Sequence, residues 1–209
     1  KCRYGFYTGT VEEKIAAEMQ QHNRIVSNNE LKNYQAVWRE PIKGTYKNYT
    51  IISMPPPSSG GIALMQLLNM MENYPLKKWG FHSVNSVSIM TEAEKRVYAD
   101  RATWLGDPDF TKVPKNELIS KSYSASRMQN VDTNSVTPAA QIKAGTFTGY
   151  ESEETTHFSI VDKYGNAVSI TTTLNDSYGS RIIVNGCGFI LNNEMDDFSA
   201  KPGEPNLYG

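Results

Sequence analysis

The residues with the clearest chemical potential lie in the run Glu153-Glu-Thr-Thr-His-Phe-Ser-Ile-Val-Asp162. A threonine hydroxyl is a weak nucleophile unless a base lies beside it, and a chain break directly before the threonine would supply its own α-amine as that base. The unperturbed pKa of an α-amine, about 7.7 to 8.0, suits proton exchange near neutral pH. Thr155 is therefore a candidate N-terminal nucleophile. The alternative is that Thr155 and Thr156 only begin a β-strand, where threonine is common.

A second cluster is the segment Leu191-Asn-Asn-Glu-Met-Asp-Asp-Phe198, which holds three carboxylates and two amides after a strand-like stretch. Such a loop could hold an ammonium group through charge-assisted hydrogen bonds. The alternatives are a solvated surface turn and an acidic metal-binding loop.

Other catalytic arrangements are missing from the sequence. No serine or cysteine lies in a Gly-x-Ser-x-Gly elbow, so a hydrolase triad is not visible. The histidines and cysteines are scattered rather than clustered at metal-ligand spacing, and two distant cysteines do not make a disulfide framework. These residues are His22, His82, His157, Cys2 and Cys187. No metal site and no cofactor are predicted.

The composition favours a folded domain with a small-molecule or peptide partner. With 209 residues, the chain is long enough for one domain with a substantial core. Its 21 Lys and Arg residues nearly balance 22 Asp and Glu residues and form no basic cluster, which argues against nucleic acid or an anionic membrane as partner. The longest apolar runs, such as residues 62–68, are far shorter than the roughly 20 residues of a membrane span, and no signal-peptide pattern opens the chain.

Capping signals predict two helices near the start of the chain. Thr10 and Glu13 have the spacing of a capping box, and apolar residues follow at four-residue steps, so a helix is predicted over about residues 10–22. Ser27 and Glu30 repeat the signal before a second, shorter helix.

The central part of the sequence predicts one hairpin and two longer helices. Residues 46–54 are rich in Tyr, Ile and Thr around a Lys-Asn turn, which indicates a hairpin. After three prolines, residues 62–72 predict a helix that is apolar almost all round and therefore buried. Residues 86–105 predict a long amphipathic helix. Residues 107–154 are polar and turn-rich, and they are predicted to be a connection rather than part of a core.

Strand patterns dominate from residue 155 onward. Apolar and polar residues alternate on both sides of the turn at residues 163–166, which predicts a β-hairpin. Residues 181–184 and 188–191 are also strand-like, and an Asn-Gly turn separates them. Helices followed by consecutive hairpins predict an α+β fold in which helices pack on antiparallel sheet.

Five motifs follow one another along the chain. They are Met54-Pro-Pro-Pro-Ser-Ser-Gly-Gly61, Ala93-Glu-Lys with Tyr98-Ala-Asp-Arg101, Leu105-Gly-Asp-Pro-Asp-Phe110, Thr155-Thr-His-Phe-Ser-Ile-Val-Asp162 and Asn192-Asn-Glu-Met-Asp-Asp-Phe-Ser-Ala-Lys-Pro-Gly203. Together they resemble the γ-glutamyltransferase (γ-glutamyltranspeptidase) family over nearly the whole chain. The resemblance implies the αββα sandwich of N-terminal-nucleophile hydrolases, present here in part. It also implies that residues 1–154 are the C-terminal part of a large subunit and residues 155–209 the start of a small one, together one domain.

The resemblance assigns a role to each of five residues. Thr155 matches the residue that directs self-cleavage and then accepts the acyl group. Thr173 matches a second threonine that hydrogen-bonds the nucleophile and tunes its amine. Asn175, Glu194 and Asp197 match the groups that hold the α-ammonium of the γ-glutamyl substrate, which agrees with the chemistry of an amide and two carboxylates.

The implied activity is transfer or hydrolysis of γ-glutamyl groups, with glutathione as the substrate class and water, an amino acid or a dipeptide as acceptor. A proenzyme would divide into two associated subunits, and a periplasmic or extracellular location is expected. Two alternatives stay open. A related acylase or capsule transpeptidase would share Thr155 but take another acyl group, and an unprocessed or inactive fragment would bind without turnover.

The resemblance places several family groups outside this sequence. The glycine pair of the oxyanion hole and the serines that bind the substrate carboxylate would follow Gly209, and the carboxylate-binding arginine would precede Lys1. One oxyanion donor typically contributes a factor of about 10² to 10³ in rate. The expectation is therefore that the chain is a piece of a longer precursor and is inactive alone.

Overall fold

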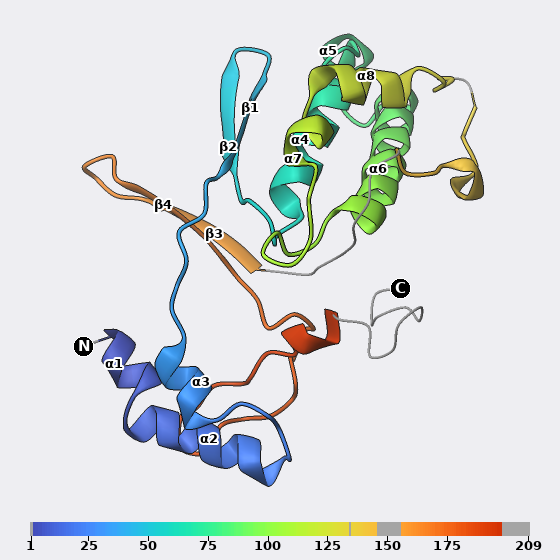
Figure 1. Ribbon diagram of the computed structural model, residues 1–209. Coiled ribbons are helices and arrows are strands. Elements are labelled where there is room, and N and C mark those ends of the chain that lie inside the picture. Colours follow the sequence, from blue (N-terminus) through green and yellow to red (C-terminus); the bar gives the residue numbers. More distant parts are fainter. Residues whose placement is uncertain (1, 134, 146–155, 198–209) are drawn as a thin grey trace. The chain divides into compact units, whose positions relative to one another are not determined.

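The computed structural model describes residues 2–133, 135–145 and 156–197 (Figure 1). The chain divides into a central unit, residues 39–153, and a terminal unit that joins residues 1–38 to residues 154–209. The terminal unit thus combines sequence from both sides of the predicted break before Thr155. The break itself, and the subunit boundary that it would create, remain predictions.

The central unit consists of one β-hairpin followed by helices (Figure 1). Its elements are β1 (Ile42–Tyr46), β2 (Tyr49–Ser53), α4 (Gly60–Met71), α5 (Leu76–Trp79), α6 (Val84–Trp104), α7 (Lys115–Leu118), α8 (Lys121–Met128) and the 3-10 turn η1 (Ala139–Gln141). The antiparallel hairpin pairs Tyr46 with Tyr49 around the predicted turn, where Lys47 has φ of 51°. The predicted hairpin and both long helices are therefore confirmed.

The long helix α6 begins two residues earlier than predicted. The Ser83 side chain accepts a hydrogen bond from the Ser86 backbone N–H at 3.2 Å, which satisfies one of the unpaired donors of the first turn. The helix ends before Leu105, whose backbone is extended. None of the helices in the described ranges combines the length and apolar character needed to cross a membrane.

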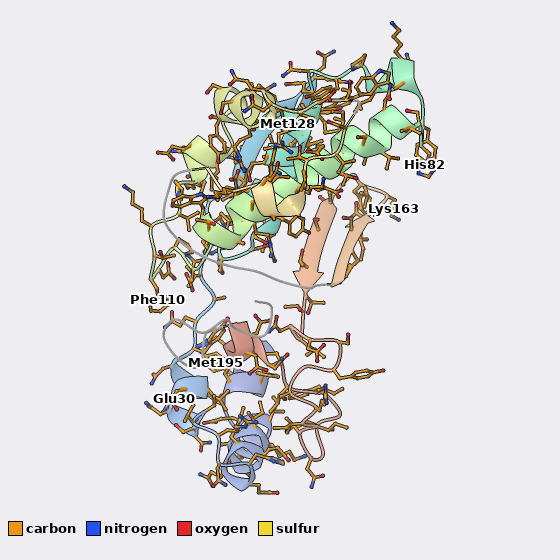
Figure 2. All side chains as sticks on the ribbon, turned by 90° about the vertical axis from the view of Figure 1, so that its right-hand side faces the viewer. Glu30, His82, Phe110, Met128, Lys163 and Met195 are labelled. Carbon is orange, nitrogen blue, oxygen red and sulfur yellow. The ribbon has the colours of Figure 1, made fainter. Side chains whose placement is uncertain are left out.

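Apolar side chains from α4 contribute to two neighbouring core clusters. One cluster contains Ile42, Ile62, Met65, Trp104, Leu105 and Leu118. The other contains Met70, Met71, Ile89, Ala93, Val97 and Met128. Figure 2 shows the side chains packed between the helices of this unit, with Met128 of α8 labelled. The helix α4 is therefore buried as predicted, and it lies against α6 and α8.

The prediction that residues 107–154 only connect other elements is wrong for the described part of that stretch. Leu118 of α7 is fully buried and Met128 of α8 is 6% exposed, each in one of the core clusters. The Asn69 side chain of α4 also donates a hydrogen bond to the Ile119 carbonyl at 2.8 Å. These helices are too short to show a clear period, and tertiary contacts hold them in place.

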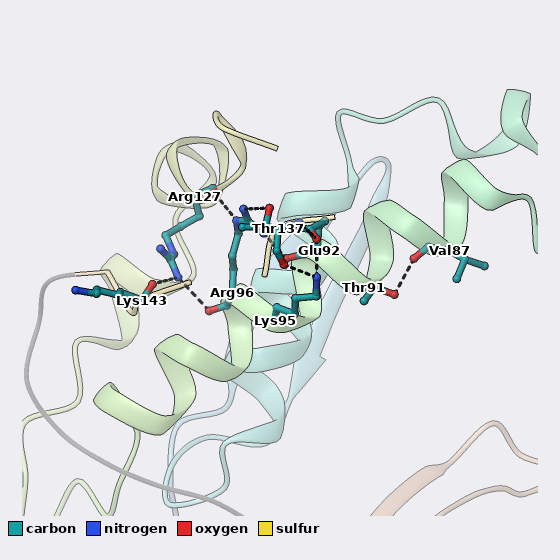
Figure 3. Close-up of polar contacts among 8 residues, drawn as sticks. All are labelled: Val87, Thr91, Glu92, Lys95, Arg96, Arg127, Thr137 and Lys143. Atoms are coloured by element: carbon teal, nitrogen blue, oxygen red, sulfur yellow. Dashed lines mark hydrogen bonds and ion pairs between the residues drawn. The ribbon is translucent and has the colours of Figure 1, made fainter. Parts of the chain in front are cut away.

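Two buried carboxylates on α6 bind polar groups of this stretch. Glu92 is 1% exposed, pairs with Lys95 and Arg96 at 2.6 Å each, and accepts the Thr137 backbone N–H at 3.1 Å (Figure 3). Arg96 in turn donates to the Arg127 carbonyl at 2.9 Å. Burial alone would raise the pKa of Glu92, but its hydrogen bonds from Lys95, Arg96 and Thr137 outweigh that effect and lower the pKa to about 2.

Asp100, one helical turn further along α6 from Arg96, holds the other end of the same stretch. It is fully buried and accepts hydrogen bonds from the Gln66 amide, the Tyr123 hydroxyl and the Gly145 backbone N–H at 2.8 to 2.9 Å. Arg127 completes an ion pair with it at 3.0 Å. Burial and the adjacent Asp100 carboxylate raise the pKa of Tyr123. Residues 137–145 are therefore fixed to α6 by their backbone.

The terminal unit contains helices from the start of the chain and a hairpin and loops from its end. Its elements are α1 (Cys2–Tyr7), α2 (Thr10–Gln21), α3 (Asn28–Asn33), β3 (Thr156–Val161), β4 (Ala167–Thr172) and the 3-10 turn η2 (Glu194–Asp197). The predicted helices over 10–22 and after Ser27 are confirmed, whereas α1 was not predicted.

The capping prediction is confirmed for α3 and is one residue out of register for α2. Ser27 caps α3, and Glu30 accepts a hydrogen bond from the Ser27 backbone N–H at 2.9 Å. For α2, Gly9 rather than Thr10 is the N-cap residue, and Glu12 rather than Glu13 accepts its backbone N–H at 2.9 Å. Glycine can hold the required backbone, with φ of 91°, without steric cost.

The strands of this unit form one regular hairpin and one irregular loop. β3 and β4 pair in antiparallel register from Thr156 opposite Thr172 to Val161 opposite Ala167, which confirms the predicted hairpin. Over residues 181–191, only an isolated bridge between Ile183 and Ile190 is formed, so this predicted pair of strands is confirmed as a turn but not as sheet.

Candidate functional site

The hairpin register brings the two predicted catalytic segments to one end of the same ribbon. Thr156 lies directly opposite Thr172. In the sequence, Thr155 comes before Thr156 and Thr173 comes after Thr172. Thr155 itself lies outside the described residues.

A tight turn follows β4 and includes the predicted residues Thr173 and Asn175. The Thr173 hydroxyl accepts a hydrogen bond from the Asn175 backbone N–H at 2.8 Å, which is the local side-chain-to-backbone contact typical of Ser and Thr in turns. Asn175 has φ of 74° and is 2% exposed. Asparagine is among the few residues other than glycine that tolerate this left-handed backbone.

The turn is joined to the acidic loop by Asn193, which was not singled out from the sequence. The Asn193 backbone N–H donates to the Leu174 carbonyl at 3.0 Å, and its side-chain oxygen accepts the Asp176 N–H at 2.9 Å. Its carbonyl accepts the Asn175 side-chain amide at 3.2 Å, and its own amide donates to the Asp196 carboxylate at 2.8 Å. Asn193 is thus a bridge between residues 174–176 and η2.

The loop preceding η2 is shaped by local amide contacts. The Asn192 side-chain oxygen accepts the Glu194 backbone N–H at 3.0 Å, and Glu194 begins η2. The backbone of Asp197 ends this turn. The structure therefore brings Thr173, Asn175 and the segment containing Glu194 and Asp197 into one hydrogen-bonded assembly. The adjacent pair Asn192-Asn193 before an acidic residue is a sequence signal that could have indicated this arrangement, since Asn side chains commonly stabilise turns in this way.

A groove of about 610 Å³ lies beside this assembly within the terminal unit. Its wall includes Asp176, Asn192, Asn193 and Asp196, together with residues from the end of α2 onward. Thr173, Asn175 and Glu194 are not among its lining residues. The groove is therefore adjacent to Asn175 and Glu194 rather than formed by them.

The acidic metal-binding loop, an alternative for residues 191–198, remains a prediction. Among the described residues, no three His, Cys, Asp or Glu side chains are grouped so as to hold a metal ion. In the loop, the Asp196 carboxylate accepts a hydrogen bond from Asn193.

The sequence and the fold were compared with those of known proteins. A family model described as Gamma-glutamyltranspeptidase matches residues 2–209. A glutathione hydrolase proenzyme of Escherichia coli strain K12 is 52% identical over 204 residues, which are 98% of this chain and 35% of that protein. This chain therefore spans about a third of the length of the curated relatives that it matches.

Two solved structures support the fold. The crystal structure of Helicobacter pylori gamma-glutamyltranspeptidase matches with a TM-score of 0.67 and 42% identity, over 68% of this chain and 41% of that one. Cephalosporin acylase from Bacillus halodurans matches with a TM-score of 0.79 over 96% of this chain and 35% of that one, and at 24% identity the likeness concerns the fold alone. The predicted α+β fold class of the N-terminal-nucleophile hydrolases is confirmed.

Proposed function

Because the chain belongs to the γ-glutamyltranspeptidase family, we propose that the whole protein transfers or hydrolyses γ-glutamyl groups, with glutathione among its substrates. The observation that carries the proposal is the match over residues 2–209, together with 52% identity to a relative named glutathione hydrolase proenzyme. The word proenzyme in that name also supports activation by cleavage. A periplasmic or extracellular location is part of the same proposal.

In the proposed mechanism, cleavage before Thr155 frees its α-amine to act as the base. The amine takes the hydroxyl proton while Oγ attacks the γ-carbonyl carbon, and the proton then passes to the leaving amine. Water, an amino acid or a dipeptide releases the acyl group from Oγ. Thr173 is proposed to position the nucleophile. This role is supported by the pairing of Thr156 with Thr172, because Thr155 and Thr173 are the next residues on the two strands.

The proposed binding groups for the substrate ammonium are Asn175, Glu194 and Asp197. Their support is the hydrogen-bonded assembly in which Asn193 ties the Asn175 turn to η2, because preorganised acceptors lose little entropy when a ligand binds. Two carboxylates beside a neutral amide favour a cation over an uncharged group.

The first experiment locates the break in the full-length protein. Intact mass measurement and N-terminal sequencing are expected to find a polypeptide that begins at Thr155. Thr155→Ala should remain uncleaved and inactive, whereas Ser152→Ala, which removes a neighbouring hydroxyl, should be cleaved normally. A break at any other bond, or cleavage of Thr155→Ala at the same bond, would refute the assignment of the nucleophile.

A related acylase is the second candidate, because a Pseudomonas protein named Acylase ACY 1 proenzyme is 38% identical over 94% of this chain. The two activities differ in whether the acyl group carries an α-ammonium. Glutaryl-anilide lacks that group but otherwise matches γ-glutamyl-anilide. A γ-glutamyltransferase should prefer the γ-glutamyl compound by about 10-fold to 150-fold in kcat/KM, the equivalent of one charged hydrogen bond. Preference for the glutaryl compound would support the acylase.

A further inference from the structure

A pocket of about 620 Å³ lies within the central unit, with walls from α6, α8 and residues 137–145. Among the described residues that line it, three carry a positive charge, Arg96, Arg127 and Lys143, and none is Asp or Glu. Ile142 is the one aliphatic side chain among them. The volume lies within the range of about 300 to 1,000 Å³ that is usual for small-molecule sites. The pocket is therefore large enough for a ligand, and its charge is of one sign.

The two arginines are held in place by buried carboxylates that do not line the pocket. Arg96, with a side chain 7% exposed, pairs with Glu92 at 2.6 Å, and Arg127 pairs with Asp100 at 3.0 Å. Arg127 Nη2 also donates to the Lys143 carbonyl at 2.8 Å (Figure 3). A guanidinium that is already fixed loses little entropy when it binds a ligand.

Both guanidinium groups keep donors for a further acceptor. Arg127 donates through Nε and Nη2, and none of the described residues accepts from its Nη1. Arg96 Nη2 has one long contact, to the Thr137 hydroxyl at 3.5 Å. A guanidinium presents five N–H donors in a planar fork whose geometry matches the oxygens of a phosphate group.

The charges around the pocket do not balance. Lys95 and Arg96 share the single carboxylate of Glu92, which leaves one positive charge in excess. Lys143 is exposed, and no carboxylate of the described residues pairs with it, which adds a second. In Figure 3 the Lys143 side chain extends away from Arg127, so it must rotate to reach a ligand in the pocket. An exposed lysine can do so at a modest cost in entropy.

We propose that this pocket binds a phosphoryl-bearing anion, with Arg96, Arg127 and Lys143 as its charged contacts. The excess of positive charge favours an anion, and the guanidinium forks favour an oxyanion over a halide. The near absence of aliphatic side chains among the described lining residues disfavours a ligand with a large apolar part. The anion joins α6, α8 and residues 137–145, and it stabilises the central unit by mass action. The site does not depend on γ-glutamyl chemistry, so it stands or falls independently of the proposed function.

The first test uses inorganic pyrophosphate and the full-length protein. Titration calorimetry measures its affinity, and hydrogen exchange read by mass spectrometry locates its site. Pyrophosphate should slow exchange in peptides from α8 and from residues 137–145, and leave peptides from α2 unchanged. Potassium chloride at the same ionic strength should not give this protection. No binding, protection confined to other parts of the chain, or equal protection by chloride would overturn the proposal.

The phosphoryl group could come from an inorganic anion or from a small phosphate ester. Titrations with inorganic phosphate and with glucose 6-phosphate distinguish these sources. Tighter binding of the ester means that the pocket also recognises the organic part, and tighter binding of the inorganic ion means that it does not. If neither competes with pyrophosphate for the pocket, phosphoryl recognition is wrong.

Matched variants of the full-length protein test the pocket residues. Lys143→Gln should raise the Kd for pyrophosphate about fivefold, the equivalent of one exposed ion pair. Asn130→Asp puts a carboxylate into the pocket wall and should raise the Kd at least about tenfold. Lys112→Gln and Asn116→Asp make the same charge changes at exposed positions outside the lining, and both should bind like wild type.

The two arginines are left in place, because removing either would leave a buried carboxylate without its partner and destabilise the fold. The four substituted positions are exposed, and far-UV circular dichroism checks that each variant is folded. Equal dissociation constants for both pocket variants and their controls would overturn the proposal.

Discussion

At the scale of single residues, Asn193 shows how one short amide side chain can join two segments of a proposed site. Its backbone and side chain hold the Asn175 turn on one side and Asp196 on the other. The neighbouring carboxylates Asp196 and Asp197 are identical in chemistry and adjacent in sequence, yet they have different proposed roles. Asp196 fixes the loop, and Asp197 is proposed to bind the substrate ammonium.

This division of roles predicts a clear difference between two substitutions. Asp197→Ala in the full-length protein should weaken γ-glutamyl substrate binding by about 1.5 to 3 kcal/mol, because a charged hydrogen bond to the ligand is lost. Asp196→Ala removes one exposed hydrogen bond to Asn193 and should have a much smaller effect. Calorimetric titration with a slowly reacting γ-glutamyl analogue measures both. Equal losses, or no loss in either variant, would show that the pocket assignment is wrong.

A second residue-scale prediction concerns the buried Glu92. Its pKa falls from an ordinary 4.5 to about 2 in the folded chain, so the unfolded chain takes up the proton first as pH falls. The stabilisation is fully present above pH 4.5 and is lost as pH falls through about 2. One pKa unit is about 1.4 kcal/mol, so the total is about 3 kcal/mol.

Urea denaturation between pH 7 and pH 2 measures this contribution. Glu92→Gln should lower the free energy of unfolding at pH 7 and flatten its decline below pH 4.5. Glu94→Gln on the exposed face of the same helix is the matched control and should follow the wild-type curve. A Glu92→Gln curve that is parallel to wild type over this range would contradict the assignment.

At the scale of elements, the sequence predicted the helices that have a clear apolar period. It missed the short helices that depend on tertiary contacts. The apolar run in α4 and the long repeat in α6 identified both helices, because each helix supplies its own pattern of burial. Helices α1, α7 and α8 have four to eight residues, too few to establish a period. The contact between Lys14 and Gly186 spans 172 residues, and no local pattern predicts it.

The start of α4 gives a prediction with a built-in control. A Cβ atom on Gly61 would lie 1.9 Å from the Met54 carbonyl oxygen, so α4 and the segment before the prolines would have to move apart. Gly61→Ala should therefore cost about 1 to 3 kcal/mol of stability. The adjacent Gly60 has only the Ser58 hydroxyl near its Cβ position, at 3.5 Å.

Gly60→Ala should accordingly be neutral or stabilising by up to about 1 kcal/mol, since alanine is the better helix former. Urea denaturation followed by far-UV circular dichroism compares the two variants. If Gly61→Ala is as stable as Gly60→Ala, the close approach of α4 to Met54 is not a feature of the folded chain.

At the scale of the whole molecule, the two units differ in how much apolar core they contain. Among the described residues, the buried apolar side chains of the terminal unit are Ile15, Ala16 and Val184, while the central unit contributes those of both core clusters. The terminal unit also joins segments that are distant in sequence, so closing its long loop adds an entropic cost. Burial of apolar area is the dominant favourable term in folding.

The terminal unit should therefore open at a lower free energy than the central unit in the isolated 209-residue chain. Native-state hydrogen exchange, read by mass spectrometry in increasing urea, is expected to show earlier exchange for peptides from α2 than for peptides from α6, since exchange reports the free energy of local opening. The double variant Lys14→Ala with Glu18→Ala loses the hydrogen bonds of these side chains to the backbone of Gly186 and Asn185, which lie within the terminal unit. It should accelerate exchange in α2 and leave α6 unchanged. Equal protection of both helices at every urea concentration would mean that the chain unfolds as one cooperative body, and the difference in core content would then have no bearing on its stability.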